Sequence, residues 1–465
     1  MSNLRYRQLP ESLYSDQAPQ PFTDMTLCDL NESWLEETPH QSAYRCPVYL
    51  RDLLNGQLPD QLKPLAMKYD GHQFGHYNPQ LGDGRGLLID EIHGPNQQLF
   101  EVHLKGAGMT PYSRGGDGRA VLRSTIREYL GSIAMHGLNI PTTNAIALGA
   151  SRDWVWREQQ EPCATLLRVT PSHIRFGHFE FLYYQRNPEE TSQLLDFVMR
   201  CHYPELSSAE AWFDKLVKRC ARLVAKWQSV GFLHGVMNTD NMSILGETLD
   251  YGPYYFLDEY RPRHVANHTD SQGRYRFDRQ PGIMRWNLAA LAQSLSQVID
   301  AKVLIESVNR FQDYFDEAYR HEMLAKLDLS EEHTGLLERW LELLETHRAD
   351  YTYSHFLLAQ DVTTNFDTLK ALFNGDAAFD NWLNDYLKTS SNIDERRTRL
   401  RQVNPKFILR HHLLNEVIAK AESGDFSDIA KYRRIFANPF QDHIEDDAMS
   451  IPPLKPVPVS LSCSS

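Results

Sequence analysis

A polar segment near the middle of the chain sets the strongest limit on how this protein can be built. Residues 234–245 read His-Gly-Val-Met-Asn-Thr-Asp-Asn-Met-Ser-Ile-Leu, and Asp250-Tyr251-Gly252 follows shortly after them. An asparagine followed by an Asp-aromatic-Gly turn is the arrangement that holds Mg²⁺ against nucleotide phosphates in phosphotransferases. Asn241 and Asp250 are therefore candidate metal ligands, and we expect the rest of the chain to supply the other parts of a nucleotide site.

The same segment is similar to the protein-kinase catalytic loop, H-R-D-x-x-x-x-N, but it departs from that pattern at one position. His234 and Asn241 fit the pattern, whereas Val236 stands where kinases have the catalytic-base aspartate. An acid, Asp240, stands next to Asn241 instead. The loop therefore predicts binding of a metal–nucleotide complex together with chemistry different from that of a kinase.

The composition admits a large enzyme and argues against several other classes of protein. The chain has 465 residues, of which 42% are hydrophobic. This is enough for roughly two to three domains or for one large two-lobed unit. The net charge of −13 argues against a general binder of nucleic acid or of anionic membranes, because both partners require a basic face. We therefore expect neither partner, and any basic site must be local.

The cysteines and the start of the chain indicate a compartment. Six cysteines are scattered without a C-x-x-C pair, which is typical of reduced cytosolic thiols rather than of a disulfide framework or a zinc site. The first residues lack the apolar core of a secretory signal, and no window approaches the roughly 20 apolar residues of a membrane span. We expect a cytoplasmic protein.

A glycine-rich stretch ahead of a predicted strand is a candidate phosphate contact. Residues 81–86 read Leu-Gly-Asp-Gly-Arg-Gly, and Leu-Leu-Ile follows at residues 87–89. Glycines let backbone N–H groups approach phosphate oxygens that a Cβ atom would obstruct. Gly82, Gly84 and Arg85 are thus candidate nucleotide contacts, although an ordinary β-hairpin turn has the same composition.

A lysine and a later glutamate have the arrangement of a phosphate-positioning pair. Residues 100–104 alternate apolar and polar side chains, as in a half-buried strand, and Lys105 ends this strand. A helix is predicted from Arg119 onward and carries Glu128, which in kinases would hold the lysine against phosphates. The basic, glycine-rich residues 106–119 between them could form a mobile loop over phosphates. The alternatives are a solvated strand end for Lys105 and a surface charge for Glu128.

Two arginines accompany a second pair of predicted strands. Strands are expected at residues 144–148 and 164–169, which gives a mainly β lobe with one helix. Arg168 lies in the second of these strands and Arg175 follows it. Guanidinium groups suit bidentate phosphate binding, but arginines in an acidic chain also form ordinary structural ion pairs.

The coarse organisation is that of an α+β protein with a two-lobed, protein-kinase-like fold. We expect an irregular N-terminal arm over residues 1–65, which packs on the core. An N-lobe is expected over residues 66–190, and a C-lobe, which contains the catalytic and metal loop, over residues 191–330. A helical extension follows over residues 331–445, and a Pro-rich flexible tail over residues 446–465.

Five motifs between about residues 68 and 293 carry a family resemblance. They are Gly-His-Gln-Phe-Gly, Gly-Asp-Gly-Arg-Gly, Lys-Gly-Ala-Gly-x-Thr-Pro-Tyr-Ser-Arg, Gly-Asp-Gly-Arg-Ala and Asn-Thr-Asp-Asn-Met-Ser-Ile. With them the chain resembles the selenoprotein O family, pseudokinase-like enzymes that transfer a nucleoside monophosphate to protein hydroxyls. The resemblance implies transfer of AMP from ATP, or of UMP from UTP, to other proteins and to the chain itself, with release of pyrophosphate. It also implies a nucleotide that binds in reverse relative to kinases, with the α-phosphate facing the acceptor.

The resemblance assigns roles to individual residues by position. Asp240 would be the proton acceptor, and Asn241 and Asp250 would bind Mg²⁺ or Mn²⁺. The other residues would contact the co-substrate, ATP or UTP: Gly82, Gly84, Arg85, Lys105 with Glu128 as its partner, Asp117, Gly118, Arg168, Arg175 and, with its metal, Asp250.

The chain departs from the family pattern at one cysteine. Cys463 in the tail matches the cysteine form of the family. Some relatives have a further cysteine ahead of Asn-His-Ser-Asp, where this chain has Ala266. That difference argues against an intramolecular redox lock at this position.

Two other classes of protein stay open at this point. One is a kinase-like phosphotransferase that uses Asp240 as base and transfers the γ-phosphate of ATP. The other is a non-catalytic ATP-binding scaffold. The displaced acid argues against the first class, and the retained metal pair and lysine–glutamate pair argue against the second.

Overall fold

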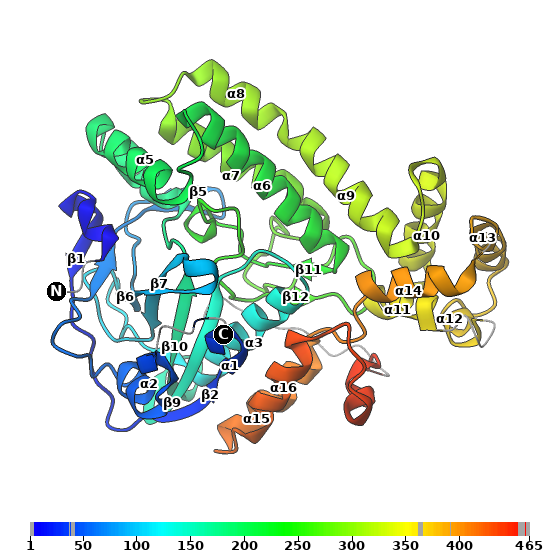
Figure 1. The fold of residues 1–465 in the computed structure, drawn as a ribbon, viewed down its shortest axis with the longest axis horizontal. Coiled ribbons are helices and arrows are strands. Elements are labelled where there is room, and N and C mark those ends of the chain that lie inside the picture. The colour runs from blue at the N-terminus through cyan, green and yellow to red at the C-terminus, as the bar shows by residue number, and fades with distance from the viewer. Residues whose placement is uncertain are drawn as a thin grey trace.

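The computed structural model describes residues 4–36, 38, 42–360, 366–390, 392–453 and 461. A lobe built on an antiparallel sheet lies against a helical lobe, and a second group of helices extends from the helical lobe (Figure 1). This arrangement confirms the predicted α+β class with a sheet lobe and a helical C-terminal region. Within the described part of the chain, none of the helices is long and apolar enough to cross a bilayer.

The sheet positions three of the predicted site residues. Its strand order is β1-β3-β6-β7-β10-β9-β2, and β8 also pairs with β10. Lys105 pairs with Leu166 and His103 pairs with Arg168 between β7 and β10. Residues paired across antiparallel strands share a face, as do residues two apart along a strand, so Lys105, His103 and Arg168 point to the same side of the sheet. The strands are β1 (Tyr14–Asp16), β2 (Thr26–Leu30), β3 (Leu65–Met67), β6 (Gly86–His93), β7 (Leu99–Lys105), β8 (Ala120–Val121), β9 (Asn144–Trp156) and β10 (Gln160–Thr170).

Helix α3 (Leu122–Gly137) packs across β9 and β10 and carries Glu128 toward the sheet. The sequence predicts the helix from Arg119, but it begins at Leu122. The reason is that Ala120 and Val121 are extended and pair with β10 as β8. Almost the whole helix is buried, including Glu128.

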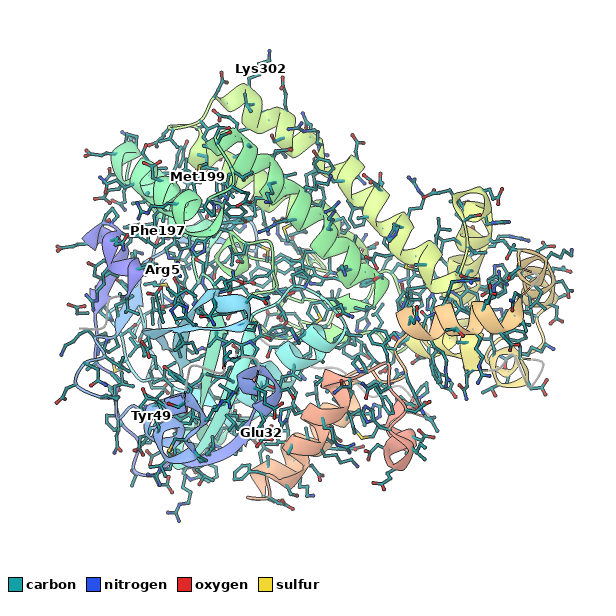
Figure 2. All side chains as sticks on the ribbon, viewed as in Figure 1. Arg5, Glu32, Tyr49, Phe197, Met199 and Lys302 are labelled. Atoms are coloured by element: carbon teal, nitrogen blue, oxygen red, sulfur yellow. The ribbon has the colours of Figure 1, made fainter. Side chains whose placement is uncertain are left out.

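The N-terminal segment contains more regular structure than the sequence predicts. It was expected to be irregular, yet β1 and β2 form the two edges of the sheet. Each edge strand is paired with a strand far away in sequence, a relationship that local periodicity does not reveal. Helices α1 (Glu32–Glu36) and α2 (Pro47–Leu54) follow, with Glu32 and Tyr49 labelled in Figure 2. Apolar residues of the segment pack into the hydrophobic clusters of the sheet lobe.

The helical lobe begins earlier than the sequence predicts. The N-lobe was expected to reach residue 190, but α4 packs on α7, so the chain leaves the sheet lobe shortly after β10. Two short β-ribbons lie near the metal loop: β4 (Gly71–Gln73) with β5 (His76–Asn78), and β11 (Phe232–Leu233) with β12 (Tyr255–Phe256). The helices are α4 (Phe176–Tyr184), α5 (Pro188–His202), α6 (Ala209–Ser229), α7 (Gln280–Leu295), α8 (Ala301–Asn309) and α9 (Phe311–Leu327).

The C-terminal helices form two groups with different partners. The first group packs around an apolar cluster that contains Trp340 and Trp382 and that also includes residues of α9 and of the segment 255–277. It consists of α10 (Thr334–His347), α11 (Tyr351–Gln360), α12 (Asp367–Leu372), α13 (Ala377–Lys388) and α14 (Ile393–Val403). The second group, α15 (His411–Glu422) and α16 (Ser427–Ala437), returns to the sheet lobe and packs on α3 (Figure 1). An ion pair of 2.8 Å between Arg433 Nε and Asp29 Oδ2 joins α16 to β2.

Part of the Pro-rich tail is described. Leu461 is buried, and its carbonyl accepts a hydrogen bond of 2.9 Å from the backbone N–H of His268. The tail therefore reaches the segment that follows Ala266. Cys463 lies outside the described residues.

Candidate active site

A cleft of about 940 Å³ lies where three segments converge. They are the glycine turn (residues 81–86), the loop over residues 112–119, and the metal loop, which runs from His234 to Gly252. Eleven of the twelve residues predicted for the site line it: Gly82, Gly84, Arg85, Lys105, Asp117, Gly118, Arg168, Arg175, Asp240, Asn241 and Asp250. Glu128 does not line the cleft, but it forms an ion pair with Lys105, which does. Glu128 is buried, so it is not the surface charge of the alternative interpretation.

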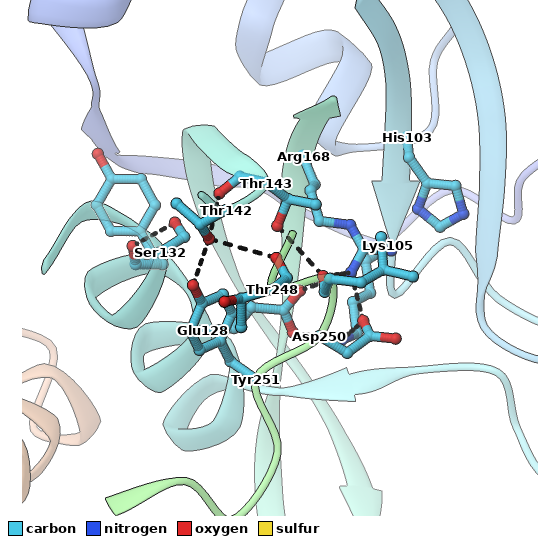
Figure 3. Close-up of polar contacts among 12 residues, drawn as sticks. His103, Lys105, Glu128, Ser132, Thr142, Thr143, Arg168, Thr248, Asp250 and Tyr251 are labelled. Atoms are coloured by element: carbon cyan, nitrogen blue, oxygen red, sulfur yellow. Dashed lines mark hydrogen bonds and ion pairs between the residues drawn. The ribbon is translucent and has the colours of Figure 1, made fainter. Parts of the chain in front are cut away.

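Buried and half-buried ionic groups form the inner wall of the cleft (Figure 3). Lys105 pairs with Glu128 and lies 3.6 Å from Asp250, Nζ to Oδ1. Arg168 contacts the same Asp250 oxygen and lies 3.3 Å from Glu128, Nη1 to Oε1. Arg175 binds the other Asp250 oxygen, Nη1 to Oδ2, at 2.5 Å. Three cations thus surround two carboxylates, which leaves an excess of positive charge facing the cleft.

The charges of this wall fix the ionisation of Asp250. Burial alone would raise the pKa of Asp250, but the positive charges of Arg175, Arg168 and Lys105 outweigh it and hold the pKa well below its ordinary value. Burial lowers the pKa of Lys105 even though Glu128 and Asp250 favour its charged form. Asp250 is therefore an anion at neutral pH.

Asp240 occupies a different environment within the same cleft. It lies in the short 3-10 helix Thr239–Asn241, and its backbone carbonyl accepts a hydrogen bond of 2.7 Å from Arg175. Its Oδ2 accepts a hydrogen bond of 3.2 Å from Gln73 Nε2, while Oδ1 is buried and has no partner in the described part of the chain. Burial raises the pKa of Asp240 to about 7, although Arg175 and the Gln73 hydrogen bond lower it. A carboxylate with this pKa can accept a proton near neutral pH.

The other two carboxylates of the cleft already have partners. Asp83 Oδ2 accepts a hydrogen bond of 3.1 Å from His103 Nε2, and Arg157 binds Asp117 through two nitrogens at 2.7 and 2.8 Å. Burial raises the pKa of Asp83, but His103, the charge of Arg175 and the N–H of Met67 together outweigh burial and lower it. The hydrogen bonds from Arg157 lower the pKa of Asp117. Among the described carboxylates that line the cleft, Asp240 alone combines a raised pKa with an unpartnered oxygen.

Asn241 and Asp250 fit a divalent cation that binds together with phosphate. The side-chain amide of Asn241 donates to the backbone carbonyl of Val236 at 3.0 Å, so its nitrogen is held and its oxygen has no partner among the described residues. The described residues contain no group of three or more His, Cys, Asp or Glu side chains that could hold a metal. Mg²⁺ is commonly held by one or two protein oxygens plus substrate phosphates, and this pair suits that mode.

The glycine turn is held by the loop that follows β7. Gly82 has φ +142°, and a Cβ atom there would lie 2.7 Å from the Tyr112 ring. Thr110 Oγ1 donates to the carbonyl of Asp83 at 2.6 Å, and Ser113 Oγ donates to that of Gly84 at 2.5 Å. A Cβ atom at Gly118 would lie 2.0 Å from the carbonyl oxygen of Gly108. Both glycines are therefore required by close packing at the cleft.

Sequence reasoning missed two groups of cleft residues. Gln73, which contacts Asp240, lies in the Gly-His-Gln-Phe-Gly motif, so that motif was an available signal. The sequence gives no comparable signal for His103 and Arg157. Their role is to bind Asp83 and Asp117, and those contacts form only in the folded protein.

The sheet lobe, the helical lobe and the lysine–glutamate pair over a metal loop define a kinase-like, nucleotide-dependent transferase. The family model described as "Protein adenylyltransferase SelO" matches residues 4–436. The chain belongs to this SelO family, which confirms the resemblance seen in the motifs.

Full-length relatives agree with this assignment. The chain is 44% identical over 477 residues to the "Protein nucleotidyltransferase YdiU" of Vibrio atlanticus, with 100% of this chain and 98% of the relative covered. Relatives of the same name from Pectobacterium carotovorum and Pseudomonas putida are 43% and 41% identical, with 98% of each relative covered.

Proposed function

We propose that this member of an adenylyltransferase family transfers AMP from ATP to hydroxyl side chains of proteins, its own among them, and releases pyrophosphate. UTP is a second nucleotide of the right chemistry, with UMP as the group transferred. Asp240 is the base in this proposal, and the residues of the inner wall hold the leaving group. The family match supports the reaction class, and the cleft supports the division of roles.

The observation that carries the proposal is the position of the free carboxylate. Val236 occupies the position of the kinase base, and its side chain cannot accept a proton. Asp240 lies next to Asn241, is buried, and retains an oxygen without a partner in the described part of the chain. A hydroxyl that donates its proton to Asp240 is therefore placed differently from the acceptor of a kinase.

The cationic wall suits the pyrophosphate leaving group. Arg168 and Arg175 are almost fully buried and fixed by Asp250, so their guanidinium groups are already oriented for phosphate oxygens. Lys105 is steadied by Glu128 and adds a third cation. Charge that develops on pyrophosphate during transfer meets groups that need not reorganise.

Asn241 and Asp250 would hold Mg²⁺ or Mn²⁺. When bound, the ion would neutralise phosphate charge. Asp250 would share its oxygens between the ion and the two arginines, because each carboxylate oxygen has two lone pairs. Gly82, Gly84, Arg85, Asp117 and Gly118 line the part of the cleft around the glycine turn and would contact the nucleotide.

The position of a phosphorus label distinguishes this reaction from phosphoryl transfer. The purified protein is incubated with Mg²⁺ or Mn²⁺ and with ATP labelled at the α or the γ phosphorus, with itself or a lysate as acceptor. We expect stable protein labelling from the α label alone. Labelling from the γ label alone would show a kinase, and tight ATP binding without labelling would show a scaffold. Asp240→Asn serves as the matched control and should lose the α-label transfer.

A further inference from the structure

A second hollow, of about 610 Å³, lies between the lobes and shares no lining residue with the nucleotide cleft. The sheet lobe contributes Gln98, Pro141 and Pro171. The helical lobe contributes the end of α5, one side of α6 and the segment 245–247. The volume lies within the range of sites that hold small metabolites.

The wall formed by α6 is cationic. Arg219, Arg222 and Lys226 stand at positions i, i+3 and i+7, so they lie on one side of the helix. Within the described part of the chain, Arg219 donates only to neutral oxygens, those of Tyr203 at 3.0 Å and Leu245 at 3.4 Å. Arg222 has no hydrogen bond or ion pair with any described residue.

Few acidic groups offset these charges. Lys226 lies 3.9 Å from Glu322, Nζ to Oε1, and donates to the backbone carbonyl of Asn139 at 3.0 Å. Glu247 is the only carboxylate among the described lining residues; Thr170 donates to it. Burial raises the pKa of Glu247 to about 7, so near neutral pH a large fraction carries a proton. In a chain of net charge −13, this hollow is locally positive.

A buried imidazole nitrogen adds a polar group without a partner. His202 lines the hollow, and its Nε2 is buried and makes no hydrogen bond within the described residues. Burial lowers the pKa of His202 to about 3, so the ring is neutral and can present either an N–H or a lone pair there. Because Nε2 has almost no accessible surface, a ligand in the hollow would not reach it without a shift of the ring.

We propose that this hollow binds a small phosphate-bearing anion, held by Arg219, Arg222 and Lys226. Guanidinium groups match phosphate oxygens bidentately, and three cations on one side of a helix suit a group with two or more negative charges. The proposal concerns a site separate from the catalytic cleft and does not depend on the proposed reaction.

The hollow is connected to the metal loop through the chain. Leu245, Gly246 and Glu247 form part of its wall and lie between Asn241 and Asp250 in the sequence. A ligand there would touch both lobes and the segment that carries a proposed metal ligand.

Cys201 lines the hollow and provides a local reporter of binding. The protein is treated with N-ethylmaleimide over time, and peptide mass spectrometry follows modification of Cys201 in the presence of orthophosphate, pyrophosphate or AMP. Exposed Cys46, outside the hollow, is the internal control. Sodium chloride at matched ionic strength controls for screening. We expect at least one of the three phosphate compounds to slow modification of Cys201, with an effect that saturates as its concentration rises. Modification of Cys46 should not slow.

Variants separate this hollow from indirect effects of the nucleotide cleft. Arg222→Gln should raise the half-protecting concentration about tenfold, because it removes a charge-assisted contact. Arg222→Glu should abolish the protection. Arg222 is exposed and has no hydrogen bond or ion pair with any described residue, so thermal unfolding should be unchanged. Lys218→Gln removes the same charge from α6 outside the hollow. In this variant the compounds should protect Cys201 at the same concentrations as in the parent.

The compounds also distinguish the source of the phosphate group. Stronger protection by AMP than by pyrophosphate would identify a nucleotide site, and the reverse order a site for inorganic phosphate. The proposal is overturned if none of the three compounds protects Cys201 at millimolar concentration. It is also overturned if Cys201 in Arg222→Glu is protected to the same extent as in the parent, because the protection then arises elsewhere.

Discussion

Gln73 donates a hydrogen bond from its Nε2 to Oδ2 of Asp240 over 3.2 Å. Asn78 donates in turn to Gln73 Oε1 at 3.0 Å, which orients the amide so that its NH₂ group faces the carboxylate. The ribbon of β4 and β5 that carries both residues is tied to the metal loop, because His72 N–H binds Thr239 Oγ1 at 2.7 Å. This ribbon therefore sets the position of the proposed base.

Gln73→Ala is expected to lower kcat about tenfold while ATP affinity stays close to that of the parent. The hydrogen bond favours the ionised form of Asp240 and lowers its pKa, so its loss raises that pKa. Because the base must be ionised, the acidic limb of the rate profile should move to higher pH. Transfer of α-label across a pH series, with calorimetric ATP titration, measures both effects.

Gln80→Ala is the matched control for this variant, since Gln80 is an exposed glutamine after the same ribbon. It should behave like the parent. An unshifted pH profile in Gln73→Ala, together with unchanged kcat, would show that the contact has no role in transfer.

Asp240→Asn is expected to stabilise the fold while it abolishes transfer. The pKa of Asp240 rises from its ordinary 3.8 to about 7 in the folded protein, so the folded state binds this proton more tightly than the unfolded state. Folding is therefore opposed increasingly as pH rises from about 4 to 7, and the full penalty applies above about 7. Thermal unfolding should show a gain for the variant at about pH 8 and almost none at about pH 4. A variant less stable than the parent at pH 8 would contradict the burial argument.

Asn241→Ala and Asp250→Ala should both weaken binding of Mg²⁺–ATP, but only the second should destabilise the fold. Asn241 donates one neutral hydrogen bond, to Val236. Removal of Asp250 leaves the buried Arg168 and Arg175 without their shared carboxylate, a loss of about 3–5 kcal/mol for broken buried pairs. Calorimetry with and without EDTA, beside thermal unfolding, separates the two effects. Parent-like Mg²⁺–ATP affinity in folded variants of both positions would refute the metal assignment.

Cys463→Ser is expected to retain parent-like transfer under reducing conditions. The chain has alanine at position 266, where some members of the family have a cysteine, so no thiol is available at that position to pair with Cys463. Initial rates of α-label transfer with excess dithiothreitol test this. Lost turnover in a folded Cys463→Ser protein would assign the thiol a role in chemistry.

Patterns of neighbouring residues in the sequence predicted three strands of the sheet lobe, β7, β9 and β10. The alternation over residues 100–104 predicts β7, and the structure confirms a strand that ends at Lys105. The predicted strands at residues 144–148 and 164–169 lie within the longer β9 and β10. The alternation of apolar and polar residues is a property of neighbouring residues, so it can be seen without the fold. The alternation did not predict that β7 is buried on both faces, with Glu101 and His103 inside. The edge strands β1 and β2 were missed because their only signal is a partner that is distant in sequence.

The same division holds for the site. The sequence by itself determined which groups the protein has for its chemistry: the acid next to Asn241, the missing base at Val236, and the glycines of the turn. Only the tertiary structure decided how they are charged and aimed. Asp250 is held anionic by Arg168 and Arg175, 82 and 75 residues away, and Asp240 receives its hydrogen bond from a residue 167 positions away. The pKa of a carboxylate depends on burial and on charges within a few ångströms, and packing of the two lobes, rather than sequence spacing, sets those distances.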